Sequence, residues 1–333
     1  MPTPRFEGPL FVVGMPRSGT KLLRDLLNQH PQIGIPAAES EFLADWARRW
    51  PSFGDLSRSD AFRSFAQRVS GSAYFVFLAE EQGQRVDVAM WHATCRDYSL
   101  AGVFEALMRL DGGVGPDGPG VWGDKSPGYI HRIPLLDQLF PTGRVIHIVR
   151  DCRDYAVSIQ KAWGKDPLRA AQRWHDRVSL AQSDGQHLGP QRYLELRYED
   201  LLGDPEATLR RAAAFVGADY DPAMITLDRP SENLGDARGQ ARIVRSNAEK
   251  WRDMDPAMRG HIEAIAGETL TALGYPVSHR GRPDRLTPTR MLAGQVLDGI
   301  RLLQGDMTER GVVGALRFRG RIFRETGRRE RLG

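Results

Sequence analysis

The chain has 333 residues, of which 41% are hydrophobic and 26% charged, with a formal net charge of +4. This composition is ordinary for a globular protein, and it excludes a disordered or collagen-like chain. No run of 18 apolar residues is present to span a membrane. The two cysteines, Cys95 and Cys152, are too few for a disulfide framework, and no signal segment precedes the first strand, so we expect a cytoplasmic protein. No cysteine–histidine cluster has metal-ligand spacing, so we expect no metal.

The first element is an apolar strand that begins by residue 10 and runs into the loop GMPRSG at 14–19 and then into an amphipathic helix. A glycine-flanked loop before a helix is typical of a phosphate cradle, because backbone N–H groups converge there on an anion. A Walker A loop needs a lysine directly after its last glycine. Here Thr20 follows Gly19, and Lys21 comes one residue later. One residue turns a helix by about 100°, so we expect Lys21 to point away from a β/γ-phosphate. The loop predicts phosphate binding without ATP hydrolysis.

The middle of the chain alternates predicted helices and strands. Residues 40–110 are predicted to be helical, with aromatic residues that form core and line a pocket. After a Gly/Pro loop at 111–120, we expect strands at 120–124, 144–149 and 191–196, and helices at 128–139, 154–163, 167–183, 205–217 and 255–273. This order predicts an α/β fold with a P-loop-like parallel sheet flanked by helices and a helical insertion at 40–110.

The C-terminal part has a different composition. A linker rich in Arg, Pro and Gly at 278–288 divides a domain at 1–278 from an extension at 279–333, which holds 13 arginines against six acidic residues. Leu292, Val296, Ile300 and Leu303 fall at helical spacing, which favours a helix packed on the core, followed by a basic end at 317–331. Contact with anionic lipid or another acidic surface is the less favoured alternative. The segment contains no nucleic-acid-binding module.

A second candidate phosphate site follows the strand at 144–149. Arg150 stands where that strand ends, and Ser158 lies two turns into the next helix. Ligands bind at the carboxyl ends of strands in open α/β sheets. A guanidinium fork matches the geometry of a phosphate, and a hydroxyl adds a hydrogen bond.

These two blocks resemble those of sulfotransferases that use 3′-phosphoadenosine 5′-phosphosulfate (PAPS). The blocks WGDKSP at 122–127 and RYEDL at 197–201 are similar to further parts of the family, and the resemblance spans about residues 8 to 275. It is closest to the bacterial and tyrosylprotein-type branch. The family usually has a proline where this chain has Cys152.

The resemblance implies PAPS as the cofactor, with adenosine 3′,5′-bisphosphate as its product, and no required metal. It implies that Arg150 and Ser158 hold the 3′-phosphate, and that Tyr198 and Lys250 contact the nucleotide. The residues implied to hold the 5′-phosphosulfate are Arg17, Ser18, Gly19, Thr20 and Lys21.

The resemblance also implies the catalytic groups. Glu39 is the first candidate for the base that deprotonates the acceptor, and Glu41 is the second. Lys125 is the candidate for stabilising the leaving oxygen, with Arg17 as a second cation. Other branches use histidine, for which the candidates are His92, His131 and His175; His147 lies inside a strand and is expected to be a core residue.

We therefore expect an enzyme that transfers a sulfuryl group from PAPS to a hydroxyl of an unidentified acceptor, which could be a small molecule, a sugar, a lipid or a peptide tyrosine. The alternatives are a P-loop nucleotide-dependent kinase and a catalytically silent nucleotide-binding protein. The late position of Lys21 argues against the kinase. The sequence leaves the acceptor and the oligomeric state open.

Overall fold

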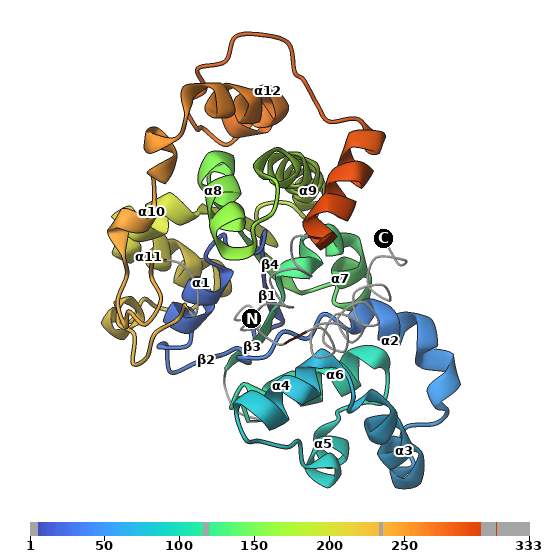
Figure 1. Ribbon diagram of the computed structural model, residues 1–333. Coiled ribbons are helices and arrows are strands. Elements are labelled where there is room, and N and C mark those ends of the chain that lie inside the picture. The colour runs from blue at the N-terminus through green and yellow to red at the C-terminus, as the bar shows by residue number, and fades with distance from the viewer. Residues whose placement is uncertain (1–5, 116–119, 233–235, 301–310, 312–333) are drawn as a thin grey trace.

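The computed structural model describes residues 6–115, 120–232, 236–300 and 311. Its centre is a parallel sheet of five strands in the order β2-β3-β1-β4-β5 (Figure 1). The α/β fold predicted from the sequence is therefore confirmed. The two-residue β2 was not predicted, because so short a strand has no periodicity to detect. The strands are β1 (Leu10–Val13), β2 (Ile33–Gly34), β3 (Val121–Lys125), β4 (Arg144–Val149) and β5 (Tyr193–Arg197).

Helices cover both faces of the sheet. Leu10 and Val12 of β1 pack into one buried cluster, and Phe11 and Val13 into the other, which is why this strand is apolar throughout. The first face is covered by α1 (Thr20–Leu27), α10 (Tyr198–Gly203) and α11 (Pro205–Val216). The second face is covered by α7 (Ile133–Leu139), α8 (Cys152–Trp163), α9 (Pro167–Leu188) and α12 (Pro256–Ala272).

The stretch predicted to be helical at 40–110 forms a group of helices at the lower end of the molecule in Figure 1. Its core is aromatic: the rings of Phe42 and Trp46 stack with centroids 4.0 Å apart, and Phe65 and Trp91 pack around them. The helices are α2 (Leu43–Arg49), α3 (Ser59–Val69), α4 (Ala73–Glu81), α5 (Val88–Thr94) and α6 (Leu100–Asp111).

Several predicted boundaries shift. The helix expected at 128–139 is a 3₁₀ turn, η2 (Pro127–His131), followed by α7. Helix α8 begins two residues early, because the carboxylate of Asp151 accepts a hydrogen bond from the backbone N–H of Arg153 and caps it. Helix α11 begins and ends as expected, with Asp204 as its cap and Gly217 in the left-handed conformation. The remaining 3₁₀ turns are η1 (Trp50–Phe53), η3 (Pro222–Ile225), η4 (Arg245–Asn247) and η5 (Lys250–Asp253).

The C-terminal helix is present at 288–300 and packs on the protein as predicted, but the apolar positions do not form the contact. Leu292, Val296 and Ile300, expected to lie on the core, are 63%, 56% and 47% exposed. The helix is held instead by Asp298, which forms an ion pair with Arg169 of α9. Leu303 and the basic end at 317–331 lie outside the described residues. No helix of the described part of the chain is both long and apolar enough to cross a bilayer.

Candidate active site

The loop at 14–19 turns the chain sharply from β1 into α1. A Cβ atom on Gly14 would lie 2.5 Å from the carbonyl oxygen of Ile148, and one on Gly19 would overlap the ring of Tyr198. Gly19 also has φ 90, a backbone conformation that side chains disfavour. Helix α1 starts at this loop without a side-chain cap. The first N–H groups of a helix attract an anion, so the local geometry suits a phosphate.

We expect Gly19→Ala to lower the free energy of unfolding of the protein. Positive φ and the contact with Tyr198 both oppose a methyl group there, and strain of this kind costs about 1–3 kcal/mol. The check is the free energy of unfolding in urea, with Gly203→Ala as the matched control, because nothing lies within 4 Å of a Cβ at Gly203. Equal losses in the two variants would contradict the strain assigned to Gly19.

A pocket of about 170 Å³ opens beside this loop. It brings together predicted site residues from distant parts of the sequence, and Arg17 donates a hydrogen bond of 3.5 Å to the hydroxyl of Ser158. The predicted residues that line the pocket are Arg17, Arg150, Ser158 and Lys250; the other lining residues are Asp154, Val157, Lys161, Ala162, Asp236 and Asn247.

Arg150 is fixed in this pocket by its neighbours. Its guanidinium donates to the carbonyl oxygens of Arg17 (3.1 Å) and Asn247 (2.6 Å) and lies 4.9 Å from the centroid of the Tyr198 ring. The hydroxyl of Tyr198 accepts a hydrogen bond from the Asn247 amide. Tyr198 does not line the pocket itself, so its contacts are those of a residue that positions Arg150 and packs against Gly19.

Three buried polar atoms at this site have no hydrogen-bond partner among the described residues: the hydroxyl of Ser18, the Nε atom of Arg150 and the Oδ2 atom of Asp154, which lies 3.9 Å from the Arg150 guanidinium. Buried polar groups are nearly always paired, so the two unpaired donors, Ser18 and Arg150, fit a polar anionic ligand. Carboxylates already contact two of the cations. Glu232 lies 2.8 Å from Arg17, and Asp236 lies 2.5 Å from Lys250. The residues present therefore fit the phosphate groups of a nucleotide.

The helix start at α1 contributes two further predicted residues. Thr20 is buried and packs over Gly14. Burial lowers the pKa of Lys21, and the charges of Glu232 and Lys125 are close enough to act on it in opposite directions. Lys21 is therefore close enough to both Glu232 and Lys125 to feel their charges.

Lys125 and Glu39 meet at the carboxyl end of the sheet. The buried Lys125, the last residue of β3, forms an ion pair with Glu39, whose side chain remains 45% exposed. The neighbouring Asp124 was not predicted from the sequence. Burial raises the pKa of Asp124 to about 7, and the hydroxyls of Ser126 and Ser40 and the charge of Lys125 partly offset that effect.

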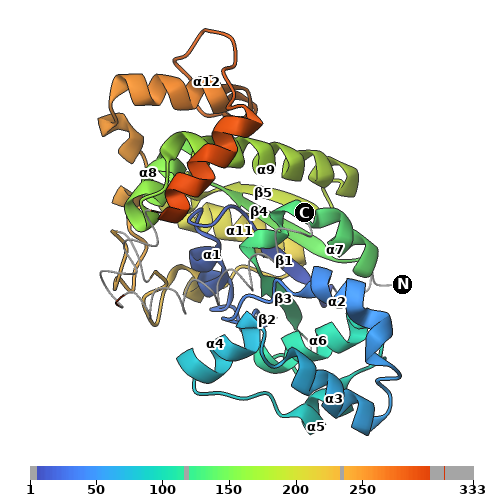
Figure 2. The ribbon, with the colours of Figure 1, turned by 45° about the vertical axis from the view of Figure 1, so that its right-hand side comes forward.

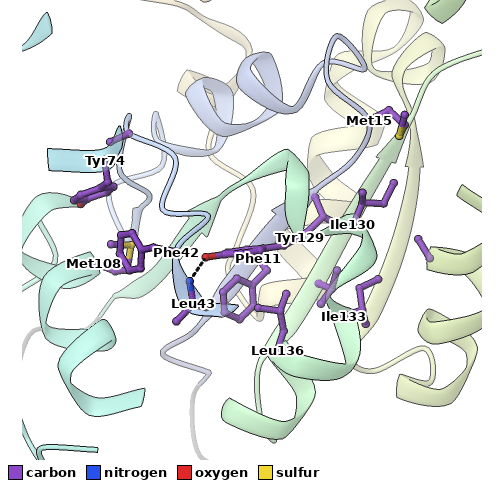
Figure 3. Packing of buried hydrophobic residues seen from close by; sticks show 14 of the residues in the cluster. Phe11, Met15, Phe42, Leu43, Tyr74, Met108, Tyr129, Ile130, Ile133 and Leu136 are labelled. Carbon is purple, nitrogen blue, oxygen red and sulfur yellow. Dashed lines mark hydrogen bonds between the residues drawn. The ribbon is translucent and has the colours of Figure 1, made fainter. Parts of the chain in front are cut away.

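Hydrogen bonds join the segment that carries Glu39 to the turn after β3. The hydroxyl of Ser40 lies 2.8 Å from that of Tyr129, and Tyr129 accepts a hydrogen bond from the backbone N–H of Leu43 (Figure 3). Glu41 has φ 39, and its carboxylate accepts a hydrogen bond from the backbone N–H of Gly128. Glu41 therefore anchors the segment, while Glu39 faces Lys125.

The candidate histidines are scattered. His92 contacts the carbonyl oxygen of Ser57 in the helical insertion, and His175 contacts Thr269 between α9 and α12. His147 lies 2.6 Å from the hydroxyl of Tyr193 inside the core, as expected. His131 lines a pocket between η2 and the helical insertion. Burial first, and then the nearby guanidinium groups, lower the pKa of His131 to about 4.

His131 predicts a pH dependence of stability. Between its ordinary pKa near 6.5 and its folded value of about 4, the unfolded chain binds a proton that the folded chain does not. The contribution of His131 to stability is therefore full above pH 6.5 and falls as the pH drops toward 4. The free energy of unfolding in urea should fall less between pH 7 and pH 5 for His131→Asn than for the wild type. Equal losses would contradict the low pKa.

The pocket that His131 lines has a volume of about 360 Å³ and lies between the Glu39 segment, α2, α3 and η2. Its lining combines apolar and aromatic side chains with guanidinium groups. The aromatic and apolar lining residues are Phe42, Trp46, Val69 and Tyr129, and the charged ones are Glu41, Asp45, Arg49, Arg68 and Arg132. Ser40 and Glu41 place this pocket next to Glu39 in the chain.

Sequence reasoning missed Asn247 and Asp236, which line the pocket at Arg150, and Glu232, which pairs with Arg17. They come from the irregular segment before η5, where no motif marks them and no periodicity exists to detect. Among the described residues, no group of three or more His, Cys, Asp or Glu side chains is placed to hold a metal ion.

Comparison with known proteins decides the family. A sequence model of the sulfotransferase family matches residues 9–222. This chain belongs to the sulfotransferase family. The resemblance noted in the sequence, and with it the expectation of a PAPS-dependent sulfotransferase, is confirmed.

Individual relatives are distant. Nodulation protein H of Rhizobium tropici is 26% identical over 263 residues, covering 76% of this chain and 90% of that protein. The omega-hydroxy-beta-dihydromenaquinone-9 sulfotransferase Stf3 of Mycobacterium tuberculosis is 28% identical over 179 residues; the match covers 49% of this chain and less than half, 43%, of that protein. The sulfotransferase domain of the Synechococcus PCC 7002 olefin synthase is 23% identical, with a TM-score of 0.55 over 83% of this chain and 98% of the domain, and shows the shared fold.

Proposed function

We propose that this sulfotransferase binds PAPS across the loop at 14–19 and the pocket at Arg150, and that Glu39 is its catalytic base. The observation that carries the proposal is the gathering of Arg17, Arg150, Ser158 and Lys250 around one small pocket beside a phosphate-type loop. The unpaired Ser18 hydroxyl and Arg150 Nε supply hydrogen-bond donors that phosphate oxygens would accept.

In this proposal the loop residues Arg17, Ser18, Gly19, Thr20 and Lys21 hold the 5′-phosphosulfate end, and Arg150, Ser158 and Lys250 hold the 3′-phosphate. Tyr198 positions Arg150 through its ring and through Asn247. A 3′-phosphate separates PAPS from ATP, so Arg150 sets the choice of nucleotide. The positions of Arg150 and Ser158 at the end of β4 and on α8 follow the rule that open α/β sheets bind ligands at the carboxyl ends of their strands.

PAPS supplies the sulfuryl group and leaves as adenosine 3′,5′-bisphosphate. The carboxylate of Glu39 accepts the proton of the acceptor hydroxyl as the new O–S bond forms. In this proposal the ammonium of Lys125 and the guanidinium of Arg17 offset the negative charge that develops on the leaving phosphate oxygen. The ion pair with Lys125 orients Glu39 before the acceptor arrives.

We propose that the 360 Å³ pocket holds the acceptor. It begins at Ser40, one residue from the proposed base, and its volume is that of a typical small-ligand site. Its aromatic side chains fit an acceptor with a flat or chain-like apolar part. A relative named for a hydroxy-menaquinone substrate supports a hydroxyl acceptor without fixing its identity.

Filling this pocket should block turnover and leave nucleotide binding unchanged. Gly71 lines the pocket, and nothing lies within 4 Å of a Cβ built on it, so Gly71→Trp can fill the space without a clash at the backbone. We expect kcat/KM for the acceptor to fall by at least about tenfold, since lost pocket contacts have effects of that size. Gly203→Trp is the control, because Gly203 is equally open but lies on α10.

The experiment incubates the purified chain with radiolabelled PAPS and a panel of phenol, sugar and lipid-alcohol acceptors, and then measures the labelled product for each variant. Label transfer that Gly71→Trp removes and Gly203→Trp leaves intact supports the acceptor site. Transfer that survives Gly71→Trp places the acceptor elsewhere.

We also propose the division into a sulfotransferase domain at 1–278 and an extension at 279–333, supported by the Arg/Pro/Gly-rich linker between them. The cytoplasmic location stays a prediction, supported by the two cysteines, Cys95 and Cys152, which are both unpaired.

A further inference from the structure

The helix at 288–300 packs on the protein through its polar side. Asp298 is buried, forms an ion pair with Arg169, and accepts a hydrogen bond of 3.0 Å from the backbone N–H of Asp166 at the start of α9. Gly294, one turn earlier, is so close to the Arg169 side chain that a Cβ there would collide with it. The views of Figures 1 and 2 both show this helix lying beside α9. Residues 294 and 298 therefore define its inner face.

The opposite face is apolar and exposed. At about 100° per residue, Leu292, Val296 and Ile300 lie on the side away from residues 294 and 298. They are 63%, 56% and 47% exposed, and Leu297 beside them is 53% exposed. Surface helices of globular proteins normally turn their apolar stripe toward the core. This helix does the reverse, so its apolar face has no partner among the described residues.

The sequence around this helix is rich in positive charge. The exposed Arg280 and Arg282 precede the helix, and the exposed Arg290 lies in its first turn. The sequence that follows, 301–333, holds nine arginines against four acidic residues, although the chain as a whole has a net charge of only +4. An exposed apolar stripe within an arginine-rich stretch of sequence is the pattern of a helix that lies in the interface of an anionic membrane.

A protein partner fits this face less well. A stable interface between proteins uses about 20–30 residues on each side, whereas the exposed stripe consists of four side chains. A lipid surface requires no matching shape, since apolar side chains enter the boundary between headgroups and acyl chains while arginines contact the headgroups. Anionic lipid is therefore the occupant that both the small apolar area and the charge favour.

We propose that the helix at 288–300 docks the protein on anionic membranes through Leu292, Val296, Leu297 and Ile300. The site consists of the described helix, and the arginines around it add electrostatic attraction. The proposal does not depend on the identity of the acceptor or on the catalytic residues.

The test is co-sedimentation of the full chain with vesicles of 70% phosphatidylcholine and 30% phosphatidylglycerol, beside vesicles of phosphatidylcholine alone. We expect binding to the anionic vesicles that weakens as salt rises. The triple variant Leu292→Ser, Val296→Ser, Ile300→Ser should lower the partition coefficient by roughly tenfold or more. The matched control is Leu180→Ser with Ile225→Ser, two apolar residues that are 44% and 41% exposed on other elements.

Thermal unfolding is compared in parallel, and the triple variant should match the wild type because the substituted side chains are exposed. Three results would overturn the proposal: no preference for anionic vesicles, equal partition of the triple variant and the wild type, or a dimer in sedimentation equilibrium that the triple variant dissociates. The last result would identify the apolar face as an interface between copies of this chain.

Discussion

Glu39→Gln is expected to lower kcat for sulfuryl transfer by about 10²–10⁴, the usual contribution of a general base. The amide keeps the size of the carboxylate but cannot accept the acceptor's proton. Glu39 contacts Lys125 rather than the phosphate pocket, so the affinity for adenosine 3′,5′-bisphosphate should change by less than about threefold. Single-turnover rates and a calorimetric titration of the same preparation separate the two effects.

Glu41→Gln is the matched control for this result. Its amide oxygen can still accept the hydrogen bond from the backbone N–H of Gly128, so the segment should keep its position. The enzyme should therefore keep most of its turnover. A larger loss of kcat in Glu41→Gln than in Glu39→Gln would transfer the role of base to Glu41. A chain without any transfer activity, in spite of tight nucleotide binding, would be the silent binder.

The second large effect is expected in stability, at Arg153. This fully buried guanidinium pairs with Asp151 (2.6 Å) and Glu263 (2.7 Å) and lies 3.7 Å from the centroid of the Trp251 ring. It ties the start of α8 to α12 and η5. Arg153→Met leaves two buried carboxylates without their cation, a change that costs about 3–5 kcal/mol.

The measurement is the free energy of unfolding in urea. Arg210→Met provides the control, because Arg210 makes an exposed ion pair with Glu206 one turn away on α11. Pairs of that kind contribute less than about 1 kcal/mol. Losses of similar size in Arg153→Met and Arg210→Met would show that the buried network does not hold the two helices together.

The meeting of the loop at 14–19 with Arg150 could be predicted because the sequence signals are local. The loop at 14–19 and Arg150 at the end of β4 each lie within one strand–loop–helix unit, where glycine positions and apolar runs determine the turn. The sheet brings such strand ends together without further information. For the same reason the caps of α11 at Asp204 and Gly217 were found at their observed positions.

The different contacts of Glu39 and Glu41 could not be predicted by the same means. Glu39 contacts Lys125, 86 residues away, and Glu41 accepts a hydrogen bond from the η2 turn. The C-terminal helix is a similar case. Its periodicity predicted a helix correctly, but the ion pair of Asp298 with Arg169, 129 residues away, decides which face turns inward.

The central claim is that Arg150 and its pocket select a nucleotide with a 3′-phosphate, and calorimetric titration of adenosine 3′,5′-bisphosphate, with ATP as the comparison, tests it most directly. We predict tight binding of the bisphosphate without magnesium, a clear preference over ATP, and a loss of about 10–100-fold in Arg150→Ala, since hydrogen bonds to charged groups contribute about 1.5–3 kcal/mol. Ser158→Ala, which removes only a hydroxyl, should weaken binding in the same direction. Preference for ATP, or affinity for the bisphosphate that neither substitution changes, would contradict the account.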